Sequence, residues 1–407
     1  MSARLRATSL DEAEVPRRDF GLERQLELAQ VPGGPPPAQQ VANGRALEGG
    51  SGPARQHGPE LTRKEGATAI TSQVIAEPPD GTDHPQRANA EPKVLRTADQ
   101  RRSRVQPNVG VVKQVELAQG VVRYREHGSG SVLVFVHGLL ASGLLWRQVV
   151  PPLARRFRCI VPDWPLGSHE LALDPRADVS PPGLARLIAD FLAALDLREV
   201  TLVGNDTGGA LCQMVAAHHP ERLSALVLTS CDAFDNFPPP AFRPLVWGSR
   251  VPGFLWLLGQ LCRLESVRRL PIAYGWLAKR GLDRDLGATY VRPCATRGDI
   301  RRDLRRVLSG VSSRYTLEAA EKLRQFHAPV LLAWSVEDRF FPFAHAQRLA
   351  TILPRATLVP IHDAWTFSPE DQPERLAAAI REFLDAYEEG RARPGEGRAV
   401  AGALRPA

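Results

Sequence analysis

Lysine is scarce in this chain: only 5 of its 52 basic residues are lysines, and the others are arginines. With 45 acidic residues the formal net charge is +7, a balance that invites a nucleic-acid or membrane partner. An arginine bias beside abundant alanine more often reflects genome base composition than a binding surface. Because no helix-turn-helix, zinc-finger or RNA-binding aromatic motif accompanies the charge, we expect no nucleic-acid partner.

Long apolar runs and paired cysteines are also missing. No apolar run reaches the roughly 18 residues that a membrane-spanning helix requires, and the N-terminus contains no apolar core of a secretory signal. The five cysteines are scattered without a CxxC pair, which is not the pattern of a disulfide framework or a zinc site. The sequence therefore predicts a reduced, cytoplasmic protein without a transmembrane segment, a metal or another cofactor.

The two ends of the chain differ from its middle in composition. Residues 1–105 hold eleven prolines and ten glycines, and Phe20 is their only aromatic residue. Such a segment has too little apolar surface to offset the entropy of ordering its backbone. We expect a disordered N-terminal extension over 1–105, for which a mis-assigned start codon is an alternative origin, and a disordered C-terminal tail over 390–407.

Between these ends, short apolar runs alternate with longer amphipathic stretches. Strands that alternate with helices imply a mostly parallel sheet with helices on both faces. The first two predicted strands, Val115–Leu117 and Val121–Tyr124, are expected to form a hairpin. The pattern predicts an α/β fold with an eight-stranded sheet, whose core spans 106–232 and 324–389. The other six predicted strands are 132–136, 159–161, 200–203, 225–228, 330–334 and 356–359.

The alternation stops over 233–323, where the sequence predicts several helices. An insertion after the sixth strand would lie near the carboxyl ends of the strands and form a lid over the crevice there. From residue 241 to 315 the segment has 15 basic and five acidic side chains. We expect this basic lid to favour anionic ligands. Its apolar blocks beside arginines are also typical of a peripheral membrane contact, although packing on the core is the simpler alternative.

A glycine-rich turn is the first candidate functional motif. Residues 200–212 are predicted to be a strand, a tight turn and a helix, with Gly204-x-Asp206-x-Gly208 at the turn. The pattern is that of a nucleophile elbow with aspartate in place of serine. A carboxylate there would lie at a helix N-terminus, where the dipole and free N–H groups stabilise negative charge. The alternative is a plain glycine-rich turn in which Asn205 or Asp206 caps the helix.

Three further segments follow predicted strands in a fixed order. A His-Gly step precedes Leu139, Asp338 follows the seventh strand, and His362 and Thr366 follow the last. Together with the elbow and the helical insertion, these segments resemble the α/β-hydrolase superfamily over residues 111–389. An aspartate at the elbow is similar to the haloalkane dehalogenase and epoxide hydrolase branch of that superfamily.

This resemblance implies a role for each matching residue. Asp206 would attack a carbon atom of the substrate and form an alkyl ester. Asp338 would be the acid that orients a histidine base, with Asp232 or Asp235 as an alternative acid after the sixth strand. His137 is expected to order its loop without transferring protons.

The substrate-binding positions match the family only in part. By resemblance, the N–H groups of Leu139 and Thr207 would form the oxyanion hole. Dehalogenases have asparagine and tryptophan at these two positions to hold a halide, so no halide site is evident here. Tyr274 and Tyr290 lie in the predicted lid and are candidates to protonate an epoxide oxygen, although a lid tyrosine is more often part of the core.

The base is the main departure from the family. Thr366 occupies the position of the catalytic histidine, and a threonine cannot accept a proton near neutral pH as imidazole does. His362 is the candidate replacement, and His345 is a weaker one. We therefore expect a hydrolase acting on an ester, epoxide or carbon–halogen bond of a small organic substrate through Asp206. The alternative is a non-hydrolytic, catalytically impaired or ligand-binding member of the same fold.

Overall fold

The computed structural model describes residues 95–96 and 111–392, and the statements below concern that part of the chain. The predicted extension over 1–105 lies outside the described residues except for 95–96. The predicted tail over 390–407 lies outside them except for 390–392. Among the described helices, none is long and apolar enough to cross a bilayer.

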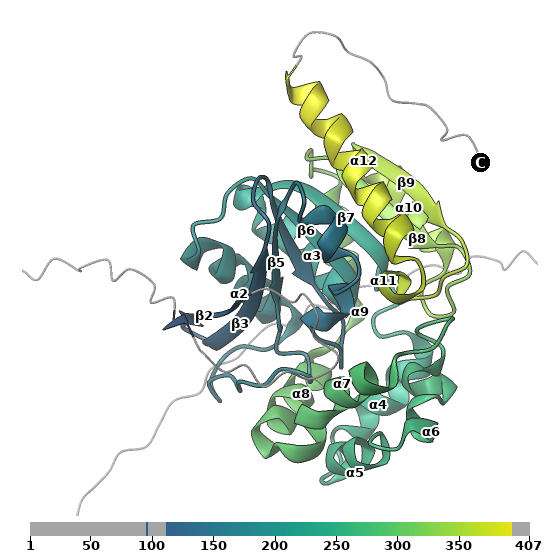
Figure 1. The fold of residues 1–407 in the computed structure, drawn as a ribbon. Coiled ribbons are helices and arrows are strands. Elements are labelled where there is room, and N and C mark those ends of the chain that lie inside the picture. Colours follow the sequence, from purple (N-terminus) through teal and green to yellow (C-terminus); the bar gives the residue numbers. More distant parts are fainter. Residues whose placement is uncertain (1–94, 97–110, 393–407) are drawn as a thin grey trace, which may run out of the picture. The chain divides into compact units, whose positions relative to one another are not determined.

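One sheet runs through the described part of the chain in the order β1-β2-β3-β5-β4-β6-β7-β8-β9 (Figure 1). The pairs β1–β2, β2–β3 and β3–β5 are antiparallel, whereas the remaining neighbours are parallel. The eight predicted strands are confirmed, and the two-residue β1 is added at one edge. The strands are β1 (Leu95–Arg96), β2 (Val111–Leu117), β3 (Gly120–His127), β4 (Val132–Val136), β5 (Arg158–Pro162), β6 (Val200–Asp206), β7 (Leu223–Cys231), β8 (Val330–Ser335) and β9 (Ala356–Ile361).

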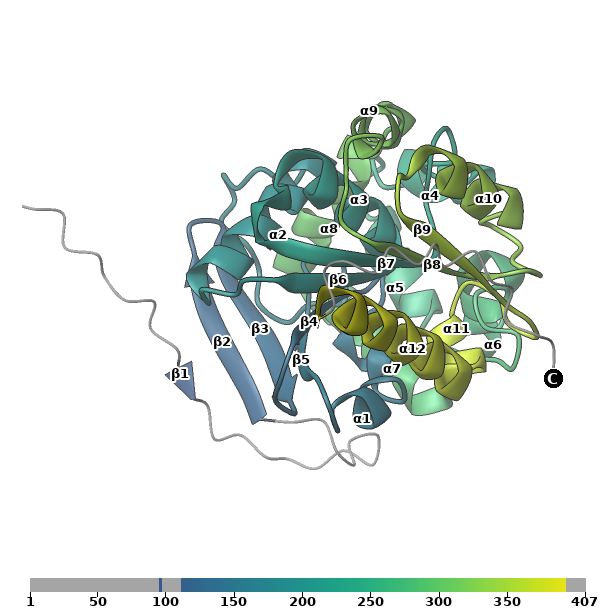
Figure 2. The same cartoon turned by 90° about the horizontal axis from the view of Figure 1, so that it is seen from above.

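Helices cover both faces of the sheet, as Figure 2 shows from above. α1 and α12 lie on one face, and α2, α3 and α10 lie on the other. Because neither face of the central strands meets solvent, every residue of β6 and β8 is buried and both read as apolar runs. These helices are α1 (Val150–Leu153), α2 (Pro181–Ala194), α3 (Thr207–His218), α10 (Phe343–Ile352), α11 (Ser368–Asp371) and α12 (Pro373–Ala392).

The predicted lid is present between β7 and β8, but it is shorter than 233–323. Its helices lie together beyond one end of the sheet in Figure 1. α9 (Ser313–Leu323), which the sequence boundary includes in the lid, packs against α3 and so belongs to the core. The lid helices are α4 (Arg243–Gly248), α5 (Phe254–Leu261), α6 (Glu265–Arg268), α7 (Arg284–Thr296) and α8 (Gly298–Gly310).

The junction of β6 and α3 leaves no room for a side chain at Gly208. A Cβ atom there would lie 2.3 Å from the Val136 carbonyl oxygen and 2.5 Å from that of His137. Both obstacles are backbone atoms at the end of β4, so they cannot move without displacing the central sheet. The helix can therefore approach the sheet this closely only with glycine at this position.

We predict that Gly208→Ala destabilises the protein by about 1–3 kcal/mol, the usual cost of overpacking a core. Gly298→Ala is the matched control, because the atom nearest to its added Cβ would lie 3.6 Å away. Thermal unfolding of both variants tests this prediction. Equal unfolding temperatures for the two variants would contradict the close approach at Gly208.

Candidate active site

Asp206 lies at the sharp turn between β6 and α3. Its backbone has φ 56° and ψ −134°, a strained conformation for a residue other than glycine. Because the turn places it at the N-terminus of α3, the helix dipole stabilises a negative charge there. The side chain is buried, and a Cβ atom on Gly138 would lie 2.2 Å from its Oδ2 atom. This geometry is that of the nucleophile elbow that the sequence predicts.

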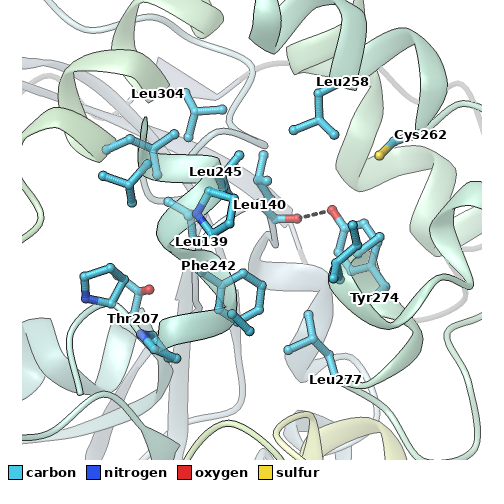
Figure 3. Close-up of a pocket in the computed structure, with 18 of the residues that line it drawn as sticks. Leu139, Leu140, Thr207, Phe242, Leu245, Leu258, Cys262, Tyr274, Leu277 and Leu304 are labelled. Atoms are coloured by element: carbon cyan, nitrogen blue, oxygen red, sulfur yellow. Dashed lines mark hydrogen bonds between the residues drawn. The ribbon is translucent and has the colours of Figure 1, made fainter. Parts of the chain in front are cut away.

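The Asp206 side chain faces a cavity of about 430 Å³ between the strand ends and the lid. Carboxyl groups of Asp206 and Asp232 and hydroxyl groups of Thr207 and Tyr274 supply its oxygen-bearing side chains. Among the described residues, no lysine, arginine or histidine lines it. Figure 3 shows apolar side chains around the rest of the wall, among them Leu139, Leu245, Leu258, Leu277 and Leu304.

The loop after β4 forms part of this wall and is fixed by two hydrogen bonds. Leu139 lines the cavity, as expected for an oxyanion-hole residue. Leu140 has a positive φ of 54°, donates its N–H to the Leu166 carbonyl at 2.8 Å and accepts the Tyr274 hydroxyl at 2.7 Å (Figure 3). The Tyr274 proton is therefore engaged by the backbone, although its ring lines the cavity. Tyr290 is buried behind the wall and is not among the lining residues.

The half-buried Asp338 and the buried Thr366 form a hydrogen-bonded pair at the ends of β8 and β9. The Thr366 hydroxyl donates to Asp338 Oδ1 at 3.0 Å, and the Phe340 and Phe341 N–H groups donate to the same oxygen at 2.8 and 2.9 Å. Thr366 thus occupies the place beside the acid where the family resemblance requires a histidine. Asp338 is positioned as a triad acid, but its partner cannot act as a base.

Among the described residues, no histidine lines the cavity in a position to replace this base. His362 is exposed at the end of β9 and does not line the cavity, so the geometry does not support its predicted role. His345 lies on α10, with its ring beside that of Phe234. His137 is buried, and its Nε2 accepts the Trp164 N–H at 2.8 Å, as expected for a histidine that orders a loop. Burial lowers the pKa of His137 to about 4, which keeps it neutral.

Asp232 joins Asp206 in the cavity wall, directly after β7. It is 1% exposed, and its Oδ2 atom accepts the Thr207 hydroxyl at 3.3 Å. From sequence it was only an alternative triad acid. A carboxyl group directly after a parallel strand was the available signal, because strand ends converge at one edge of the sheet. Asn205 is a candidate helix cap from sequence, but its amide instead donates to the Thr366 carbonyl at 2.8 Å and connects the elbow to that loop.

Burial makes the three carboxyl groups hard to ionise. It raises the pKa of Asp206 to about 7, and the charge of Asp338 adds to the increase while the Thr207 N–H opposes it. It raises the pKa of Asp338 to about 6 in spite of the donors around that group. Burial and the charge of Asp206 raise the pKa of Asp232 well above its usual range. Among the described residues, no group of His, Cys, Asp and Glu is arranged to hold a metal ion.

Comparison with known families agrees with this geometry. The family model described as alpha/beta hydrolase fold matches residues 131–367. The chain belongs to the α/β hydrolase fold family. An uncharacterized hydrolase of Bacillus subtilis is 27% identical over 272 residues, which are 65% of this chain and 95% of the relative. The match therefore covers nearly the whole length of the Bacillus subtilis relative.

Two relatives have names that state a reaction. A cis-3-alkyl-4-alkyloxetan-2-one decarboxylase of Xanthomonas campestris is 28% identical over 67% of this chain and 95% of the relative. Haloalkane dehalogenase 2 of Mycobacterium tuberculosis is 27% identical over 65% of this chain and 92% of the relative. A haloalkane dehalogenase structure from Bradyrhizobium elkanii superposes with a TM-score of 0.60 at 20% identity, over 70% of this chain and all of that one. The structural likeness shows the shared α/β hydrolase fold.

We predict that Asp206→Asn stabilises the protein at pH 8 and has little effect near pH 4. A carboxyl group whose pKa rises on folding binds its proton more tightly in the folded state. Burial of Asp206 therefore costs stability as the pH rises from about 4 to about 7. Each unit of pKa corresponds to about 1.4 kcal/mol, so the gain should reach several degrees in unfolding temperature.

Thermal unfolding of the wild type and the variant at both pH values tests this prediction. Asp235→Asn is the control, because Asp235 is three residues from Asp232 but exposed. An Asp206→Asn variant that is no more stable than the wild type at pH 8 would contradict a costly buried carboxylate.

Proposed function

We propose that this protein is an enzyme that uses Asp206 as a nucleophile on a small, neutral and largely apolar organic substrate. The observation that carries the proposal is the strained elbow, which presents the Asp206 carboxyl group to a largely apolar cavity. Strained backbone persists where the surrounding structure enforces it, and such positions cluster at active sites. A capping aspartate would not require this strain, and Asp206 makes no side-chain capping bond to α3.

In the proposed reaction, the Asp206 carboxylate attacks an electrophilic carbon atom of the substrate. The bond from this carbon to an oxygen or halogen atom breaks, and a covalent ester forms on Asp206. If water then hydrolyses this ester, the N–H groups of Leu139 and Thr207 would stabilise the oxyanion that develops on its carbonyl oxygen. Both residues line the cavity next to the elbow. The apolar wall would hold the substrate and exclude bulk water from the ester.

The lining of the cavity favours a neutral substrate over the anionic one that the basic lid suggests. Asp206 and Asp232 contribute potential negative charge, and no arginine or lysine among the described residues reaches the wall to balance an anionic ligand. A halide leaving group also lacks its usual partners, because Thr207 and Leu139 occupy the positions where dehalogenases have tryptophan and asparagine. The oxetanone in the name of the Xanthomonas relative is a neutral cyclic ester with two alkyl groups, a chemistry that suits this wall.

A second candidate function is a non-hydrolytic reaction at the same site. It is supported by the Thr366–Asp338 hydrogen bond, which fills the position of the base that would activate water. Decarboxylation, the reaction in the name of the Xanthomonas relative, consumes no water. A catalytically impaired or ligand-binding member of the family would have the same feature.

We predict that Asp206→Asn lowers turnover at least about 10³-fold, because removal of a nucleophile eliminates the covalent step. The assay panel would contain an alkyl epoxide, a dialkyl β-lactone, a short-chain ester and a 1-haloalkane. Asp235→Asn is the matched control with the same chemical change at an exposed site. Activity on any of these substrates that survives Asp206→Asn would rule out the covalent proposal for that substrate.

A single turnover in ¹⁸O-labelled water separates the two candidate functions. Hydrolysis of an ester on Asp206 places a water oxygen in the Asp206 carboxyl group, because water attacks the ester carbonyl carbon. We expect ¹⁸O in the peptide that contains Asp206 after one turnover. Product formation without ¹⁸O in that peptide would contradict the covalent ester, and a product that also lacks ¹⁸O would support the non-hydrolytic alternative.

A further inference from the structure

Asp232 is a second carboxyl group in the cavity, and as an alternative triad acid it would have no histidine to orient, because no described histidine lines the cavity. Its Oδ2 atom accepts the Thr207 hydroxyl at 3.3 Å, while its buried Oδ1 atom has no hydrogen-bond partner. The Gln213 side-chain amide donates to the Asp232 carbonyl at 2.8 Å, which fixes the backbone at the end of β7. A buried, unpartnered carboxyl oxygen in the wall of a cavity is costly unless it binds a proton or a ligand.

The other groups near the cavity cannot transfer protons as readily. The Tyr274 hydroxyl is bound by the Leu140 carbonyl, and burial raises its pKa far above neutral. Thr366 donates to Asp338 outside the cavity wall, and His362 is exposed. Cys262 and Cys294 also line the cavity, but burial raises the pKa of both thiols. Among the described side chains of the wall, Asp232 is therefore the best candidate for acid–base catalysis beside the nucleophile.

We propose that Asp232 donates and accepts the protons of the reaction, and that the leaving atom of the substrate is an oxygen that departs as an alkoxide, as in an epoxide. This inference rests on the proposed function of Asp206 as the nucleophile. Burial raises the pKa of both carboxyl groups, and the charge of Asp206 raises that of Asp232 further, so we expect the two groups to hold one proton between them. The elbow turn and the N–H of Thr207 favour the charge on Asp206, which leaves the proton on Asp232.

In the first step, the Asp206 carboxylate attacks a ring carbon of the epoxide. The bond from this carbon to the ring oxygen breaks, and the oxygen takes the proton of Asp232. The products of this step are a hydroxyalkyl ester on Asp206 and a carboxylate on Asp232. A halide would leave without a proton, so a protonated carboxyl group would give it no advantage.

In the second step, the Asp232 carboxylate removes a proton from water, and the hydroxide adds to the ester carbon of Asp206. The tetrahedral adduct expels the alkoxide, which takes the proton back from Asp232. The product is a diol, and one proton remains on the carboxyl pair as at the start. One residue thus supplies the acid for ring opening and the base that Thr366 cannot provide.

The test compares two alkylating agents of equal chain length, an alkyl epoxide and an alkyl bromide, in single-turnover alkylation followed by intact-protein mass spectrometry. For Asp232→Asn we expect epoxide alkylation to slow at least about 10²-fold, the usual contribution of a general acid. Bromide alkylation should change less than about 3-fold, because bromide leaves without a proton. The ester formed on this variant should also persist, since its base is missing. Asp285→Asn, the same change at an exposed site on α7, should behave as the wild type.

The wild type provides a second readout that does not depend on the folding of a variant. As the pH rises above neutral, epoxide alkylation should decline while bromide alkylation does not. Equal slowing of both reagents in Asp232→Asn, or no slowing of either, would overturn the role of Asp232. Absence of any adduct with either reagent in the wild type and in Asp232→Asn would instead refute Asp206 as the nucleophile, and the inference would fall with it.

An independent observation concerns the outer surface of the lid. Of the twelve large apolar side chains exposed among the described residues, nine lie between residues 247 and 276. We call these nine the lid patch; they are Trp247, Val251, Trp256, Leu257, Leu261, Leu264, Leu270, Ile272 and Trp276. Leu257, Leu261 and Leu264 follow helical spacing along one face of α5 and the turn after it. Leu270 and Ile272 are 46% and 73% exposed and also line the cavity, so the patch reaches the cavity wall.

The charges around the patch indicate what it contacts. Arg243, Arg250 and Arg263 are exposed, and within the described part of the chain none of them forms an ion pair. Glu265 is the one acidic residue between 241 and 280, and Arg269 and Arg284 already pair with it. Apolar side chains interspersed with unpaired arginines are the chemistry that binds an anionic bilayer surface. The helices that carry them, α4, α5 and α6, lie together in Figure 1.

We propose that the lid patch docks on an anionic phospholipid bilayer, from which an apolar substrate could enter the cavity beside Ile272. The full-length protein should co-sediment with phosphatidylglycerol vesicles more strongly than with phosphatidylcholine vesicles, and salt should weaken this binding. Leu257→Asp should lower the binding at least about 10-fold. Leu317→Asp is the matched control, because Leu317 is 41% exposed on α9 and Leu257 is 50% exposed.

Absence of sedimentation with anionic vesicles would overturn this proposal, and so would equal binding by the two aspartate variants. A stable dimer that Leu257→Asp dissociates, without vesicle binding, would show that a second copy of the chain covers the patch. Both readouts measure binding alone, so they are independent of the reaction at Asp206.

Discussion

The close approach of α3 to the central strands is the constraint on which the active site depends. Gly208 and Gly138 bring the elbow against the end of β4, where a Cβ atom on either residue would overlap backbone or the Asp206 carboxyl group. The approach forces Asp206 into its strained conformation and holds its side chain at the base of the cavity. Tight backbone packing in this fold thereby fixes the position of the Asp206 carboxyl group.

Burial then determines how readily the carboxyl groups of the site ionise. Asp206, Asp232 and Asp338 are all enclosed, and each has a raised pKa because low polarity penalises its charge. Proteins retain such a costly arrangement where function requires it. In the account proposed here, the pair that faces the cavity, Asp206 and Asp232, carries the reaction. Asp338 and Thr366 instead form a hydrogen-bonded remnant of the triad that holds two loops together.

The fold and the elbow could be predicted because they depend on local pattern. The apolar runs of β4 and β6 and the glycines around Asp206 predict a strand, a tight turn and a helix, and the structure has these elements in that order. The role of His362 could not be decided from sequence, because it depends on the direction in which one side chain leaves the end of β9. The mainly apolar lining of the cavity could not be predicted from the sequence either. Arginines are abundant in the lid sequence, but none of the described ones lines the cavity.

Peptide mapping of the wild-type protein after brief exposure to an alkyl epoxide tests the central claim most directly. The account predicts one new covalent mass, located on the peptide that contains Asp206 and lost in Asp206→Asn. An adduct located on another residue, or product formation with no adduct on Asp206 at any time in the turnover, would contradict it.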